Sequence, residues 1–117
     1  MKKNNVVQEK SFAFAVEIVE LCQYLVNDKK QYDLGRQLLR SGTSIGANIE
    51  EAIGGQSKKD FFAKLTISYK EARETHYWLR LLMQTNILEK ERGKPLLKSC
   101  DELMRIIGSI QKAIRER

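Results

Sequence analysis

The sequence has 117 residues, enough for one hydrophobic core and too few for two. Hydrophobic residues make up 42% and charged residues 31%, which excludes a disordered or collagen-like chain. Lys and Arg total 21 against 15 Asp and Glu, so the formal net charge is +6 and the pI is about 9.4.

The few cysteine and histidine residues limit the chemistry of the chain. Cys22 and Cys100 are the only cysteines, too few for a disulfide scaffold or a four-cysteine zinc site. His76 is the only histidine, so a di-iron bundle site and a His-Glu-x-x-His metalloprotease helix are both excluded. We therefore expect no metal, no cofactor and no enzymatic activity, with both cysteines packed in the core.

His76 has two interpretations. A lone general base next to Glu71 or Glu74 is one, and a histidine at the edge of a helix bundle is the other. Because Tyr69, Ala72 and Leu79 lie on the same side of the expected helix, we favour the second.

Targeting signals are not apparent in the sequence. Glu9, Lys10 and Glu17 interrupt the apolar stretch that a signal peptide would need after its basic start. No apolar run approaches the roughly 20 residues that cross a bilayer. We expect a cytoplasmic protein without membrane contact.

Two helices are predicted in the first half of the chain. Ser11 is a typical cap for a helix over residues 11–26, whose core stripe we expect to contain Phe12, Ala15, Val19, Cys22 and Val26, widened by Val16, Ile18 and Leu25. A second helix is predicted over residues 32–53, ending at Gly54 and Gly55 in a left-handed turn.

The middle of this second helix is unusual, because residues 41–47 are nearly all small. A glycine-rich phosphate loop is one interpretation, but it lacks the preceding strand and the Lys-Ser/Thr ending of a Walker motif. We favour a continuous helix that packs closely against a neighbour.

Two more helices are predicted in the second half. Ser57 and Asp60 resemble a capping box for a helix over residues 57–85, with Leu65, Ala72 and Leu79 on its core side. Pro95 fits the first turn of a helix over residues 95–115, whose apolar positions repeat at intervals of four and three. The fold class is therefore all-α, an antiparallel up-down-up-down four-helix bundle in one domain. The apolar arc of the third helix is wider than one bundle requires.

One pattern of charges points to a ligand. The face of the third helix opposite its core side carries Lys59, Lys70, Arg73, Tyr77 and Arg80. Such a basic ridge can follow a phosphate backbone, and Tyr77 can stack on a base. The alternative is an ordinary solvated helix face.

A second group of polar residues lies on one side of the second helix. Arg40, Ser44 and Glu51 share this side, and Arg40 can pair with a carboxylate of the third helix. Asn48 can satisfy buried polar groups between helices. We interpret these residues as structural, with ligand binding as the alternative.

Residues 40–52 also carry a resemblance. Together with residues 57–61 and 72–79, they resemble the bacterial 23S rRNA intervening-sequence proteins, whose pattern is Arg-Ser-x-x-Ser-Ile-x-x-Asn-Ile-x-Glu followed by a short turn and Ser-Lys-x-(Glu/Asp)-Phe. The likeness extends over about residues 12–114. Gly93, Lys94 and Pro95 depart from the pattern, where family members have helix-forming residues.

The resemblance implies an antiparallel four-helix bundle that assembles into a ring, commonly a pentamer. A related branch, the accessory variability determinants of diversity-generating retroelements, binds nucleic acid and a reverse transcriptase through a basic ring. The resemblance implies no catalytic residues, and it assigns Arg40, Ser44, Asn48 and Glu51 only structural roles.

Three hypotheses follow. The first is a non-enzymatic homo-oligomer, with a pentamer favoured, that binds RNA or DNA through Lys and Arg. The second is an adaptor that binds another protein, in which case the positive charge serves solubility or steering. The third is an enzyme or a small-molecule binder, which needs converging polar groups in a pocket.

Overall fold

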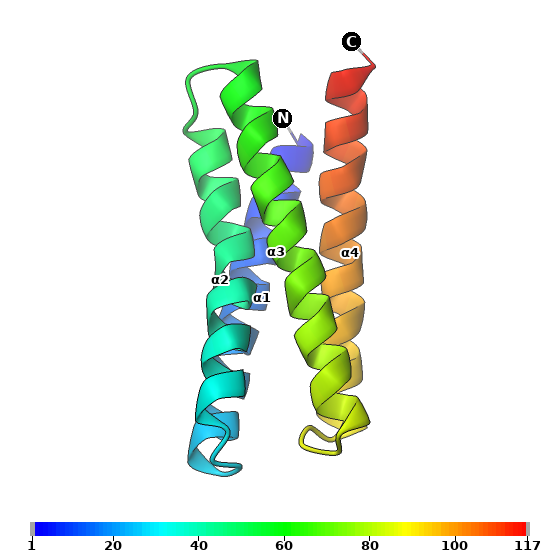
Figure 1. The fold of residues 1–117 in the computed structure, drawn as a ribbon. Helices are drawn as coiled ribbons and strands as arrows, with labels where there is room; N and C mark the ends of the chain where they lie inside the picture. Colours follow the sequence, from blue (N-terminus) through cyan, green and yellow to red (C-terminus); the bar gives the residue numbers. More distant parts are fainter. Residues whose placement is uncertain (1, 117) are drawn as a thin grey trace.

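Four antiparallel helices form the molecule in a computed structural model that describes residues 2–116 (Figure 1). They are α1 (Lys2–Asn27), α2 (Tyr32–Ile53), α3 (Lys58–Gln84) and α4 (Lys90–Arg115). Each helix contacts the two helices beside it, and the Cα atoms of the diagonal pairs α1/α3 and α2/α4 stay more than 8 Å apart. The bundle measures 47 × 20 × 19 Å, and both ends of the chain lie at the same end of it. The predicted all-α bundle is confirmed.

An apolar stripe from every helix meets in the core. Large side chains less than 2% exposed come from all four helices, among them Ile18, Ile45, Leu79 and Leu103. Most of the predicted core positions of α3 and α4 are buried, Cys100 included, whereas Phe61 and Ile114 are only partly buried. Burial of such side chains provides the main free energy that holds helices together, at roughly 25 cal/mol per Å² of apolar surface.

Helix α1 begins at Lys2, not at Ser11 as predicted. Ser11 is 1% exposed, and its hydroxyl donates to the carbonyl of Gln8 within the helix, so it does not act as a cap. The added turns are held by burial of Val7 and by the Gln8 side-chain amide, which donates to Glu50 at 2.9 Å.

The predicted core stripe of α1 is also wrong in part. Phe12 is 68% exposed, and Val16 and Val19 are exposed as well, whereas Phe14 and Leu21 point into the core. The reason is that α1 carries two apolar stripes, and only one of them can face the other three helices.

Helix α2 is continuous through its small residues, as predicted. Gly42 and Gly46 are buried, because α1 approaches them closely: a Cβ at Gly42 would lie 2.7 Å from Cγ2 of Ile18. The predicted left-handed ending is wrong, since Gly54 has φ −80°. Left-handed backbone instead occurs at Lys30 and Asn86, in the other two connections.

Helices α3 and α4 begin differently. Ser57 caps α3, with its hydroxyl accepting the amide hydrogen bond of Asp60, as the sequence predicts. Helix α4 starts five residues before the predicted Pro95, which therefore lies inside the helix instead of in its first turn. Since Pro95 has no N–H, the carbonyl oxygen of Glu91 lacks its usual backbone partner.

Contacts with α1 hold the early start of α4. The Tyr24 hydroxyl donates to the Glu89 carboxylate at 2.6 Å, which lowers the pKa of Glu89 and raises that of Tyr24. The Arg92 guanidinium lies 4.0 Å from the centre of the Tyr24 ring. These contacts fix the first turn of α4, and with it the orientation of Lys90 and Lys94.

Candidate nucleic-acid interface

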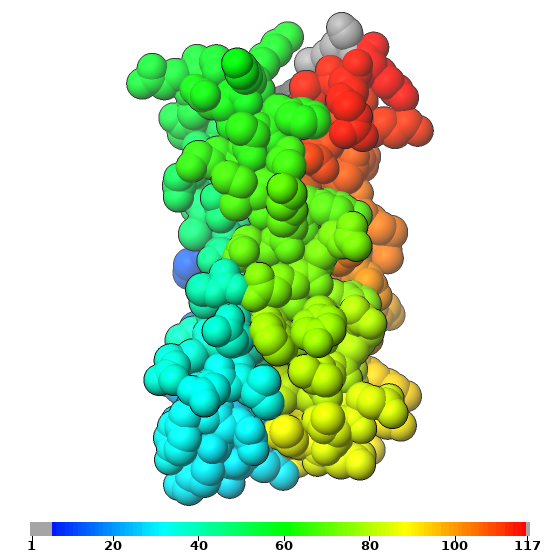
Figure 2. Space-filling model, in the orientation of Figure 1, coloured from blue at the N-terminus to red at the C-terminus, as the bar shows by residue number. Residues whose placement is uncertain are grey.

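Helix α3 presents the predicted basic residues on one face. Lys59, Lys70, Arg73, Tyr77 and Arg80 are all exposed, and α3 runs the length of the face drawn in Figure 2, with α2 on one side and α4 on the other. Lys59 lies eleven residues before Lys70, about 16 Å along the helix axis. The structure therefore gathers four of the five predicted residues and leaves Lys59 apart.

Two cavities open between α3 and α4 next to this face. The larger, of about 460 Å³, is lined by Tyr77, Arg80, Leu81, Met83, Gln84, Lys90, Lys94 and Leu97. The smaller, of about 400 Å³, is lined by Tyr69, Arg73, His76, Tyr77, Arg80 and Met104. Because Tyr77 and Arg80 line both, the cavities adjoin, and together they form a depression that we call the α3–α4 groove.

Lys90, Lys94 and Leu97 were missed as part of this site. Their spacing of four and three places them on one face of a helix, but only if that helix starts by Lys90. The sequence predicts that α4 starts at Pro95. Both lysines precede this predicted helix, so the prediction does not place them on any helix face. The early start of α4 supplies the second wall of the groove.

Positive charge dominates the α3–α4 groove. Within residues 2–116, none of the lining cations Arg73, Arg80, Lys90 and Lys94 forms an ion pair, and neither does Lys70 beside the groove. Cations without a carboxylate partner remain available to an anionic ligand.

His76 links Arg80 to an acid on α4. Its Nδ1 accepts a hydrogen bond from Nε of Arg80 at 3.0 Å, and its Nε2 lies 3.0 Å from Oδ1 of Asp101. This network assigns the proton to Nε2, and it engages Nε of Arg80 and not its terminal nitrogens. His76 thus lies at the bundle edge, as favoured, and its acidic neighbour is Asp101, not Glu71 or Glu74.

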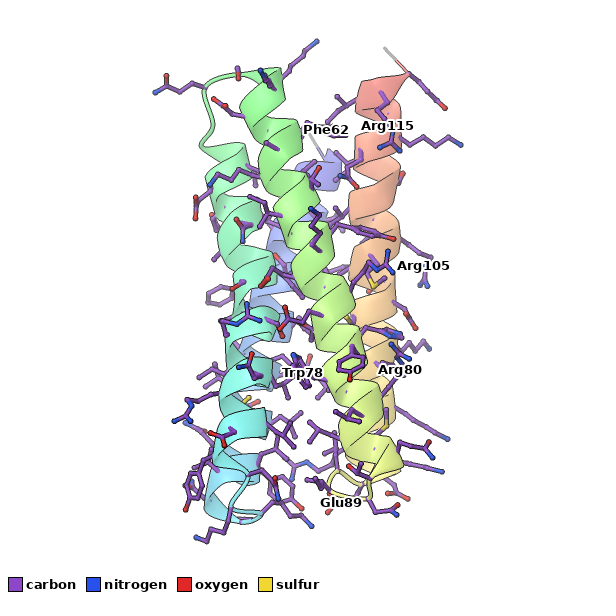
Figure 3. All side chains as sticks on the ribbon, in the orientation of Figure 1. Phe62, Trp78, Arg80, Glu89, Arg105 and Arg115 are labelled. Carbon is purple, nitrogen blue, oxygen red and sulfur yellow. The ribbon has the colours of Figure 1, made fainter. Side chains whose placement is uncertain are left out.

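A polar cluster lies on the other side of α3, between α2 and α3. Arg40 donates to Glu71 at 3.0 Å and to Glu74, as predicted, and the indole N–H of Trp78 donates to Glu74 at 3.0 Å. Figure 3 shows Trp78 on the α2 side of α3 and Arg80 on the α4 side. We call Arg40, Glu71, Glu74 and Trp78 the arginine cluster.

Of the remaining motif residues of α2, Ser44 and Asn48 make contacts within the helix and Glu51 contacts α3. The Ser44 hydroxyl donates to the carbonyl of Arg40, and the Asn48 amide donates to the carbonyl of Ser44, so the predicted role of Asn48 between helices is wrong. Glu51 pairs with Lys64 of α3 at 2.8 Å. Buried hydrogen bonds between α2 and α3 come instead from Ser68 and Thr75.

A group of exposed apolar side chains lies on the side of the bundle formed by α1 and α2. Phe12, Val16 and Val19 of α1 and Leu39 of α2 are exposed, and Val19 and Leu39 line a third cavity, of about 310 Å³. We call these four residues the outer apolar surface. The wide apolar arc expected on α3 is therefore not the main exposed apolar area, since α3 contributes only Ile67 and Tyr77 to the large exposed hydrophobic residues.

The described part of the chain has neither a metal-binding cluster nor a membrane-spanning helix. Across residues 2–116, no group of three or more His, Cys, Asp or Glu side chains is arranged to hold a metal ion. No helix in this range has both the length and the apolar character needed to cross a bilayer.

Comparison with known proteins places the chain among its relatives. The family model described as 23S rRNA-intervening sequence protein matches residues 3–109. The crystal structure of a protein of unknown function from the S23 ribosomal protein family of Bacteroides thetaiotaomicron is 48% identical, with a TM-score of 0.92, over 94% of this chain and 98% of that one. A search of curated proteins gave no match.

Proposed function

Because the chain belongs to the 23S rRNA-intervening sequence protein family, we propose that it is a non-enzymatic homo-oligomer that binds RNA or DNA through the α3–α4 groove. One observation carries the proposal: two adjoining cavities are lined by four cations from two helices, and within residues 2–116 none of these four forms an ion pair. They are Arg73 and Arg80 of α3 and Lys90 and Lys94 of α4. A row of phosphates is the ligand that neutralises several such cations together.

The groove favours a polyanion over a small anion for a geometric reason. Lys70, Arg73 and Arg80 lie along α3, and Lys90 and Lys94 lie along α4 beside them. Cations distributed along two helices match the repeated phosphates of a polyanion better than they match one small anion. Binding to single-stranded nucleic acid should weaken by about 0.7 log unit per contact for each log unit of salt, giving a slope of about −3 for four or five contacts.

Self-association is supported by the outer apolar surface. Its Phe12 is 68% exposed, although aromatic side chains in a monomer are commonly buried. Glu17 and Glu20 are exposed on the same helix, and residues 11–27 contain no Lys or Arg. Pairing this surface with itself would bring glutamates together, so we propose that it contacts a different face of the next copy. Such contacts form rings when they close, in accord with a pentamer.

Nucleic-acid binding is tested with a charge-matched pair of variants. We expect K70E/R73E/R80E to weaken binding of a labelled RNA or DNA strand strongly, measured by fluorescence anisotropy between about 50 and 200 mM salt. The control K30E/R36E/K58E changes exposed cations outside the groove by the same total charge. Each triple lowers the formal net charge from +6 to 0, so equal losses in both would contradict a groove-specific site.

Self-association is tested by sedimentation after nuclease treatment. We expect a mass several times 13.6 kDa, close to five times for a pentamer, and a lower mass for F12S/V16S. A monomeric wild-type protein would contradict the oligomer. A second protein that co-purifies in fixed ratio and survives nuclease treatment would favour an adaptor instead.

A further inference from the structure

The larger cavity of the α3–α4 groove has an apolar interior that phosphate binding does not explain. Leu81, Met83 and Leu97 line it together with the ring of Tyr77, whereas Arg80, Lys90 and Lys94 supply positive charge. Its volume of about 460 Å³ falls in the range of small-molecule pockets, about 300 to 1,000 Å³. A surface that only followed a phosphate backbone would need the cations alone.

The Tyr77 ring is held in a fixed orientation. It is 49% exposed and packs against Trp78 in a T-shaped arrangement, with ring centroids 5.1 Å apart and an interplanar angle of 71°. Trp78 is itself anchored through its indole N–H to Glu74, which Arg40 of α2 holds from the other side. The arginine cluster therefore orients Tyr77 without touching the groove, and a preoriented ring loses little entropy on binding.

Cations stand next to this ring. The Arg80 guanidinium carbon lies 5.9 Å from the centre of the Tyr77 ring and is tethered by His76. Lys90 and Lys94 are one helical turn apart on the facing wall. An aromatic platform flanked by cations matches a base with phosphates on both sides of it.

We infer that the larger cavity seats one unstacked base of a single-stranded nucleic acid, with Tyr77 stacking on the base and Arg80, Lys90 and Lys94 binding the neighbouring phosphates. The bases of a duplex are stacked on one another and cannot enter a side pocket without being extruded, which costs a few kcal/mol. This inference rests on the proposed nucleic-acid function and specifies its ligand as a single strand.

The experiment distinguishes binding to bases from binding to phosphates. Binding of four labelled ligands of equal length is measured at one salt concentration: an RNA strand, a DNA strand, a DNA duplex, and a DNA strand in which every nucleotide is abasic. We expect the base-bearing strands to bind about tenfold more tightly than the abasic strand, because stacking on one aromatic side chain is worth about that factor. Comparing the affinities for the RNA strand and the DNA strand shows which of the two nucleic acids the protein prefers.

Variants test whether the tenfold preference for base-bearing strands arises in this cavity. Y77A should remove the preference for bases while leaving the salt slope unchanged, because it removes no charge, and Y77F should retain the preference. Y32A is the matched control, since Tyr32 is an exposed tyrosine on α2 outside the groove. K94Q should instead lower the salt slope by about 0.7 and bind bases and abasic strands in the same ratio as wild type.

The outcomes separate this inference from the proposed function. Equal binding of abasic and base-bearing strands, or tighter binding of the duplex, would overturn the base pocket, and the K70E/R73E/R80E triple would still weaken phosphate binding. Loss of the base preference in Y32A as much as in Y77A would also overturn it. If none of the four ligands binds, both the inference and the proposed function fail.

Discussion

Glycine residues with different surroundings show how individual positions set the packing of this bundle. At Gly42, a Cβ would lie 2.7 Å from Cγ2 and 2.9 Å from Cγ1 of Ile18, a fully buried and β-branched side chain. At Gly108, the nearest atom to a Cβ would be Cε2 of Tyr69, at an ordinary 3.8 Å. Both glycines lie inside helices, so their intrinsic helix propensity is the same.

The two glycines therefore predict opposite effects of alanine. Gly42→Ala should destabilise the protein by about 1–2 kcal/mol, because overpacking costs about 1–3 kcal/mol and higher helix propensity returns up to about 1. Gly108→Ala should stabilise it by about 0.5–1 kcal/mol. Urea unfolding followed by circular dichroism measures both. A stabilised Gly42→Ala would mean that α1 and α2 are not in close contact there.

The cysteines are expected to be unreactive. Burial raises the pKa of both Cys22 and Cys100 to about 12, so almost no thiolate is present at pH 8. We expect slow labelling of the folded protein by iodoacetamide and fast labelling in urea. Rapid labelling of either thiol in the folded state would contradict this burial.

The same shifts predict a dependence of stability on pH. An unfolded thiol ionises near pH 9, while the folded one stays protonated up to about pH 12. The unfolded state therefore binds fewer protons in this window, and the free energy of unfolding should fall as the pH rises from 9 towards 12. Replacing Cys22 with Ala should reduce this fall, as measured by urea unfolding at several pH values.

At the scale of the elements, the bounds of α2 and α3 agree closely with the sequence prediction, whereas α1 and α4 both start earlier. Ser11 is a residue type that commonly caps helices. In the fold it is instead a small residue inside α1 that allows Gly46 of α2 to approach closely. Pro95 is typical of a first turn, yet contacts of Glu89 and Arg92 with Tyr24 extend α4 beyond it. In both cases a tertiary contact overrides a local signal.

Pro95 interrupts the backbone hydrogen bonding of α4. It is exposed and lies within α4, so Pro95→Ala should lose no packing and should restore a hydrogen bond to the carbonyl of Glu91. We expect an increase in stability of about 1–3 kcal/mol in urea unfolding. Ser57→Ala is a useful comparison, because loss of the α3 cap should lower stability by about 1 kcal/mol. Unchanged stability of Pro95→Ala would indicate that the first turns of α4 contribute little.

At the scale of the whole molecule, the α3–α4 groove and the outer apolar surface lie on different sides. The basic ridge follows from spacing on one helix and was predictable, but the groove requires the second wall from α4. The outer apolar surface was misassigned to the core because two apolar stripes on one helix look alike in sequence, and only the positions of α2 and α4 decide between them. Patterns within an element predict its faces, and the arrangement of elements decides which face is covered.

The separation of the two surfaces predicts an effect of strand length. In a ring, one long strand can contact several grooves, so linked sites bind it more tightly than single sites do. F12S/V16S should bind a strand of about 10 nucleotides as wild type does, and a strand of about 60 nucleotides at least tenfold more weakly. Anisotropy titrations with both strands measure this. Equal affinities of the two proteins for the long strand would mean that assembly does not contribute to binding.

Trp78 has a spectroscopic consequence. It is the chain's only tryptophan, and its indole lies against the ring of Tyr77 that lines the groove. Its emission is therefore sensitive to whatever stacks on that tyrosine, and the unmodified protein carries its own optical reporter. A titration that follows this emission would register occupancy of the groove without a label on either partner.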